Sequence, residues 1–91
     1  MILRELLVVI EDEREIVELL LEAGVLAPPL ERDYSDVEAE QARVARVLLR
    51  DLDVNLAGVE VILRMRDEML ALRQQMTELL IRVQETRGPK D

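Results

Sequence analysis

The sequence predicts an all-α protein, with a small helical domain over residues 1–54 and one long dimerisation helix over residues 55–86. Hydrophobic residues make up 49% of the 91 positions and only Tyr34 is aromatic, so any core is built from aliphatic side chains. Apolar residues recur at helical spacing, and the C-terminal pattern is longer than a core of this size can cover. We expect the tail at residues 87–91 to fray.

Two short helices are expected first. Residues 3–10 form an apolar run that predicts either a short buried helix or a strand, because so few residues show no clear period. From Glu13 to Glu22 the apolar and acidic side chains follow the period of a helix. Asp12 is its expected N-cap, and Gly24 stands where a left-handed C-cap would end it.

A connector and a longer helix follow. The pair Pro28-Pro29 forbids further helix, so Leu30 to Tyr34 is either a connector or one strand of a small wing. Ser35 and Glu38 have the spacing of a capping box, which opens a helix that runs to about Leu52. The predicted inward stripe of that helix consists of Val37, Gln41, Val44, Leu48 and Leu52.

The last helix carries two apolar stripes. Asn55 is its expected cap, and at about 1.5 Å per residue its length to Glu85 is roughly 45 Å. Leu56, Val59 and Leu63 suit packing on the short helices. The second stripe, here called the seam, advances in alternating steps of three and four, as in a coiled coil. This spacing favours an antiparallel homodimer over packing within the chain, although it leaves a parallel pair open. The seam consists of Ile62, Met65, Met69, Leu72, Met76, Leu79 and Val83.

Composition argues against an enzyme and against a cofactor. Cys and His are absent, which excludes thiolate nucleophiles, Cys–His zinc sites and imidazole catalysis. The carboxylates of residues 11–22 lack both an aromatic pocket and a calcium-loop pattern, so they predict a solvated acidic face and no metal site. The three glycines are far apart, which excludes a phosphate-binding loop.

The same composition predicts a cytoplasmic protein with no membrane partner. Charged residues come too early for a signal peptide, and no apolar run approaches the roughly 18 residues of a membrane span. A membrane-surface helix would be basic, whereas the best amphipathic helix here is acidic.

The net charge of −8 is unevenly distributed. Residues 1–40 carry 3 basic and 12 acidic side chains, a net charge of −9, whereas residues 41–91 carry 9 basic and 8 acidic ones. The acidic N-terminal part repels phosphate backbones and favours a partner with a basic surface.

Three stretches resemble known proteins. Residues 14–28 resemble the recognition-helix region of MerR-like domains, in which a helix ends in a Gly-Leu-Leu-like hook before a Pro. Residues 34–37 resemble the start of the next helix. Residues 52–63, with Asn-Leu-Ala-Gly-Val, resemble a junction found in heat-shock MerR-like repressors and in CbpM-type chaperone modulators. The resemblance covers residues 5–85 and implies a helix-turn-helix domain, with a possible minimal wing, before a long helix.

The departures from the pattern favour the chaperone modulators. DNA-reading relatives place Arg and Tyr on the second helix, where Arg14 is the only cation here, and Arg in the wing, where Arg32 stands between two acidic residues. Phosphate contacts supply much of protein–DNA affinity, so nucleic acid is not an expected partner. Relatives usually have Gly at the position of Glu11, which predicts a distorted turn.

The modulator resemblance implies that the chain binds a DnaJ-like co-chaperone through its J-domain and regulates its work with DnaK. The J-domain presents a basic helix to DnaK, which an acidic modulator can cover. We assign Glu15, Glu18 and Glu22 to electrostatic steering and rim contacts, and Val25 and Leu26 to the apolar anchor. The alternatives are a MerR-like DNA-binding transcription regulator of heat-shock type and a dimerisation module with an unrelated partner.

Overall fold

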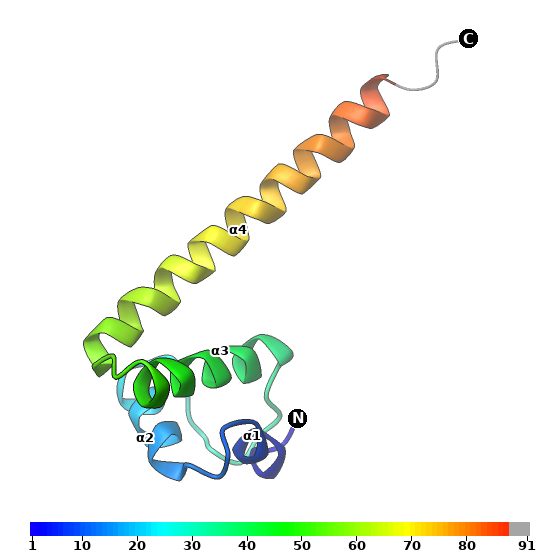
Figure 1. The fold of residues 1–91 in the computed structure, drawn as a ribbon. Helices are drawn as coiled ribbons and strands as arrows, with labels where there is room; N and C mark the ends of the chain where they lie inside the picture. Colours follow the sequence, from blue (N-terminus) through cyan, green and yellow to red (C-terminus); the bar gives the residue numbers. More distant parts are fainter. Residues whose placement is uncertain (88–91) are drawn as a thin grey trace.

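The computed structural model of the protein describes residues 1–87, and within them it is all-α, with no strand. The all-α prediction is therefore confirmed for this part of the chain. The short helices gather at the base of one long helix, which projects away from them (Figure 1). The molecule measures 61 × 26 × 20 Å along its principal axes. The elements are α1 (Leu3–Val9), α2 (Arg14–Glu22), α3 (Asp36–Arg46), a π-helical segment η1 (Val47–Asp51) that continues α3, and α4 (Leu56–Arg87).

We call residues 1–67 the head and residues 68–87 the shaft. Within the head, α3 packs against α1, α2 and α4. The core between these helices is aliphatic apart from Tyr34, which is 2% exposed. Its largest fully buried side chains besides Tyr34 are Leu6, Ile10, Ile16, Leu20, Leu26 and Val59. No helix in the described part of the chain is both long and apolar enough to cross a bilayer.

The turn between α1 and α2 has an unusual backbone. Residues 3–10, for which the sequence left helix and strand open, form α1 and its C-cap. Glu11 and Asp12 follow with φ of 56° and 61°, a left-handed conformation that favours glycine. The distortion expected at Glu11 is thus present. The prediction of Asp12 as N-cap is wrong, because Glu13 holds that position without a side-chain cap bond.

The end of α2 follows the local prediction. Gly24 has a φ of +76°, its N–H donates to the Leu21 carbonyl at 3.1 Å, and the Val25 N–H donates to the Leu20 carbonyl at 2.9 Å. This pair of bonds is the Schellman motif, which satisfies carbonyls that a helix end leaves free. Of the two alternatives for residues 30–34, the structure has the connector and no wing strand. The connector is fastened where the Tyr34 hydroxyl donates to the Leu30 carbonyl at 2.6 Å.

A complete capping box opens α3, as predicted. The Glu38 N–H donates to Ser35 Oγ at 3.1 Å, and the Ser35 N–H donates to Glu38 Oε1 at 3.1 Å. The helical course then continues through η1 to its C-cap at Leu52. A π-turn holds one more residue per hydrogen-bonded ring than an α-turn, so it widens the end of this element.

The predicted inward stripe of α3 is confirmed at Leu48 and in part at Val44, which packs against the core, and it is wrong at the exposed Val37 and Leu52. Val37 and Leu52 are 65% and 63% exposed, and Gln41 and Val44 are only partly buried. Small side chains at a helix contact let the helix axes approach more closely, which suits an element that packs against three neighbours. The residues that α3 and η1 bury are Ala39, Ala42, Ala45 and Leu48.

The start of α4 belongs to the head. Asn55 caps it as predicted, since its Oδ1 accepts from the Gly58 N–H at 2.8 Å. Val59 and Leu63 are buried and Leu56 is partly buried, which confirms that the first turns pack on the short helices. The helix includes Arg87, and the rest of the tail expected to fray lies outside the described residues.

Candidate functional site

The acidic face of α2 is exposed but not uniformly free. Glu18 and Glu22 lie at the surface, and neither forms an ion pair within residues 1–87. Glu15 is 68% exposed, yet its Oε1 accepts a hydrogen bond from Arg50 Nη2 at 2.8 Å. Of the three predicted steering residues, the structure therefore leaves two without an internal partner.

The N-terminal end of α2 is electrostatically compensated by α3 and η1. Arg50 Nε also bonds Glu13 Oε1 at 2.9 Å, and Arg46 pairs with Glu11 and with Glu13. These pairs join segments more than thirty residues apart, as the separation of 37 between Arg50 and Glu13 shows. On α2 itself, the carboxylates without an ion pair in the described residues are consequently those of Glu18 and Glu22, which we call the acidic patch.

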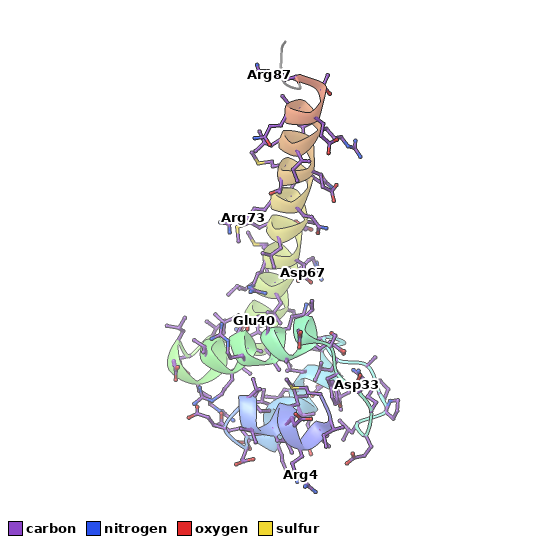
Figure 2. The ribbon with its side chains drawn as sticks, turned by 90° about the vertical axis from the view of Figure 1, so that its right-hand side faces the viewer. Arg4, Asp33, Glu40, Asp67, Arg73 and Arg87 are labelled. Carbon is purple, nitrogen blue, oxygen red and sulfur yellow. The ribbon has the colours of Figure 1, made fainter. Side chains whose placement is uncertain are left out.

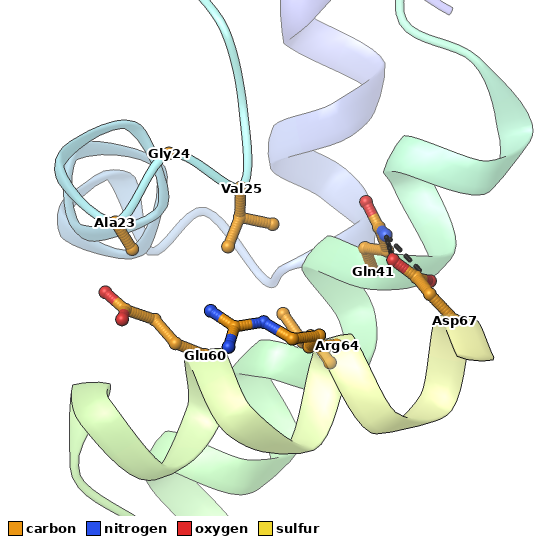
Figure 3. Close-up of a pocket in the computed structure, with 8 residues that line it drawn as sticks. Ala23, Gly24, Val25, Gln41, Glu60, Arg64 and Asp67 are labelled. Carbon is orange, nitrogen blue, oxygen red and sulfur yellow. Dashed lines mark hydrogen bonds between the residues drawn. The ribbon is translucent and has the colours of Figure 1, made fainter. Parts of the chain in front are cut away.

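The predicted apolar anchor is only partly available. Leu26 is 1% exposed and its N–H donates to the Leu20 carbonyl at 3.1 Å, so its assignment to partner contact is wrong. The chain bends back sharply after Gly24, and this bend carries Leu26 into the core. Val25 is half-buried and faces a cavity of about 280 Å³ between the end of α2 and α4 (Figure 3).

This cavity has a mixed lining. Glu60 and Arg64 approach it from α4, and at its edge Gln41 Nε2 donates to both carboxylate oxygens of Asp67 at 3.2 Å (Figure 3). One arginine beside two carboxylates gives the cavity no single charge with which to select an anion or a cation. The Gln41–Asp67 contact instead joins α3 to α4.

A cluster around Arg32 fastens the connector. Its guanidinium donates to Glu38 Oε1 and Oε2 at 3.1 and 2.5 Å and lies 4.1 Å from the centroid of the Tyr34 ring. The Arg32 hydrogen bond, together with the Ser35 N–H, lowers the pKa of Glu38 from 4.5 to about 2. Burial raises the pKa of the Tyr34 hydroxyl. Arg32 thus has a structural partner and is not a free cation.

The whole predicted seam lies on the surface of the single chain. Its members range from 36% exposed at Ile62 to 65% at Met76. Their exposed fractions are 62% for Met65, 48% for Met69, 61% for Leu72, 61% for Leu79 and 43% for Val83. A continuous apolar stripe of this length on a water-exposed helix is typical of a surface that is buried by a partner.

One surface feature has no counterpart in the sequence prediction. Leu3 and Leu7 of α1, Val17 of α2 and Leu30 of the connector line an apolar groove. The only local signal for it is that α1 is apolar on two sides, because Leu6 and Ile10 fill the core while Leu3 and Leu7 face the groove.

No group of three or more Asp or Glu side chains in residues 1–87 is arranged to hold a metal ion. No protein family, curated protein or solved structure matches the chain.

Proposed function

We propose that the protein is a cytoplasmic, non-enzymatic modulator of a DnaJ-like co-chaperone. It binds the J-domain through the acidic patch on α2, forms a homodimer through the seam on α4 and regulates the work of the co-chaperone with DnaK. The observation that carries the proposal is the distribution of ion pairs on α2. Arginines compensate the N-terminal end of the helix, whereas Glu18 and Glu22 face solvent without an internal partner.

Charge supports a protein partner with a basic helix. Of the arginines on α3 and η1, Arg43 pairs with Glu40, and Arg46 and Arg50 pair with carboxylates near the start of α2. Few cations are then left in the head to contact a phosphate backbone, which disfavours the DNA-binding alternative. A sequence-selective gel shift at nanomolar protein would favour that alternative and contradict the proposal.

The seam supports a homodimer. An isolated helix shorter than about 15 residues is marginal in water, and one the length of the shaft gains most of its stability from packing. A second copy offers the same alternation of Met, Leu, Ile and Val, so the two seams are self-complementary. Burial of both seams gives the shaft the packing that the single chain does not provide.

The J-domain interaction is tested by reversing the acidic patch. We expect the double variant Glu18→Lys, Glu22→Lys to associate with an immobilised J-domain about an order of magnitude more slowly at low ionic strength, because steering scales with the local potential. The difference should shrink as salt is added. Stopped-flow or surface kinetics at two salt concentrations measure both effects.

The matched control carries the same charge change on the shaft. Glu78 and Glu85 are exposed, lie off the seam and form no ion pair in the described part of the chain. The variant Glu78→Lys, Glu85→Lys should therefore associate at close to the wild-type rate. Equal association rates for the two double variants at low salt would remove α2 from the interface.

A further inference from the structure

The apolar groove between α1, α2 and the connector has the dimensions of a side-chain pocket. It consists of two adjoining hollows of about 70 and 230 Å³, which share Leu3, Leu7 and Arg14 in their lining. Its floor is nearly buried at Leu7 and Val17, which are 6% and 3% exposed, whereas Leu30 at its edge is 37% exposed. The groove is therefore a hollow with an apolar floor and partly polar sides that one bulky side chain can enter.

The charges at its rim are unusual for this head. Residues 1–40 contain only three basic side chains, and Arg32 is bonded to Glu38. The other two, Arg4 and Arg14, both line the groove, and neither forms an ion pair within residues 1–87. Arg4 lies at the end of the head remote from the shaft (Figure 2). In a region with a net charge of −9, the two cations without an internal partner thus flank one apolar groove.

We infer that this groove docks a segment of a protein partner that presents one bulky apolar side chain next to a carboxylate. The apolar side chain packs on Leu3, Leu7 and Val17, and the carboxylate accepts hydrogen bonds from Arg4 or Arg14. Glu18 and Glu31 also border the groove and balance the two arginines in net charge, so the groove suits a single carboxylate placed beside Arg4 or Arg14 better than an anion with several charges. The net charge of −8 likewise disfavours an anionic membrane.

The groove also offers an apolar contact site for the proposed interface, in which the predicted anchor Leu26 is buried. Glu18 belongs both to the acidic patch and to the groove lining, so the two surfaces are continuous. A partner bound at the patch can insert its apolar side chain here, in place of contact with the buried Leu26. The inference rests on the proposed function only in taking the partner to be a protein.

A random library of peptides of about 12 residues, displayed on phage and selected on the full chain, tests the chemistry directly. We expect enrichment of peptides that contain a single carboxylate next to a large aliphatic or aromatic residue. The double variant Arg4→Glu, Arg14→Glu should bind them about tenfold more weakly or worse. Both positions lie in the first turn of a helix, where glutamate suits the helix dipole, so the variant should keep the fold.

Two further variants separate charge from shape. Leu30→Asn makes the apolar edge polar without changing the net charge and should also weaken the peptides, although it leaves both arginines intact. Arg64→Glu with Arg87→Glu makes the same charge change outside the groove and should bind like wild type. Enrichment of basic peptides, equal binding to all variants, or no enrichment would each overturn the inference. The J-domain kinetics of the Glu18, Glu22 variant test the proposed function separately, so the failure of one proposal is distinguishable from the failure of the other.

Discussion

The head and the shaft contain similar aliphatic side chains, but the head buries many of them and the shaft leaves them exposed. Every helix of the head buries some of its leucine, isoleucine, valine or alanine residues in one core. The shaft, over residues 68–87, buries none of its side chains. The contrast teaches that apolar content does not decide burial within a chain. Helices α1, α2 and α3 are short enough to cover one another, whereas α4, at 32 residues, extends beyond everything that can cover it.

Charges divide in the same way. In the head, Arg46 and Arg50 pair with carboxylates of the α1–α2 turn and the start of α2. Along the shaft, Arg73 and Arg82 form no ion pair with any residue up to Arg87. Most arginines of the head therefore form internal ion pairs. The polar side chains beside the seam of the shaft are left available for contact with a second chain.

The largest expected effect comes from charging the seam. Replacing Met69 and Met76 together by Asp places carboxylates against the apolar face of a partner helix, which should raise the dimer dissociation constant by about two orders of magnitude or more. Helical circular dichroism should fall as well, because the released shaft is marginal alone. Sedimentation velocity and far-ultraviolet spectra measure the two effects. A wild-type chain that is monomeric at tens of micromolar would contradict the dimer. The exposed seam of the shaft would then not be explained by a second copy of the chain.

A core truncation is expected to separate the two regions more directly. Leu20 is 0% exposed, so Leu20→Ala should destabilise the head by about 2–5 kcal/mol through lost burial and a cavity. The matched change Leu70→Ala, at a position 42% exposed and outside the seam, should cost no more than about 0.5 kcal/mol. Urea unfolding measures both. Equal losses would mean that α4 and the head are packed alike.

A smaller effect concerns acid stability of the head. The pKa of Glu38 is lowered from 4.5 to about 2 in the folded chain, so its stabilisation is complete above pH 4.5 and is lost as pH falls from there to about 2. We expect Glu38→Gln to cost about 1–2 kcal/mol at neutral pH, a reduced value because the side chain is 25% exposed. The free energy of unfolding of this variant should also fall less steeply below pH 4.5 than that of the wild type.

The control for this effect lies on the shaft. Glu78→Gln removes an exposed carboxylate without a described partner and should leave the urea midpoint and its pH dependence close to wild type. Urea midpoints at pH 7, 4 and 3 for the three proteins make the comparison. Parallel curves for wild type and Glu38→Gln would show that the Arg32 contact does not stabilise the head.

Most of the incorrect sequence predictions involve contacts between residues far apart in the chain, although the N-cap predicted at Asp12 is a local one that was wrong. The caps at Ser35 and Asn55 and the left-handed Gly24 were predictable, because each depends on bonds within a few residues of the chain. The inward face of α3 was not predictable in the same way, because a pattern of bulky apolar residues does not reveal that small ones such as Ala42 are buried. The acidic face of α2 was located correctly, but its pairing at Glu15 depends on Arg50, which is 35 residues away.

By itself, the sequence determined the all-α class, the helices after residue 13 and the apolar stripe along α4, whereas it left residues 3–10 open between helix and strand. These features depend on local signals, namely the periodicity of apolar residues, the capping residues, and the Gly and Pro residues that end helices. The spacing of apolar residues in particular indicates which face of a helix is apolar. Only the tertiary structure decided that Leu26 turns inward, that alanines form the contact face of α3, and that Arg4 and Arg14 border one groove. Those outcomes depend on which residues meet across the head, because burial and charge pairing are properties of neighbours in space and not of neighbours in the chain.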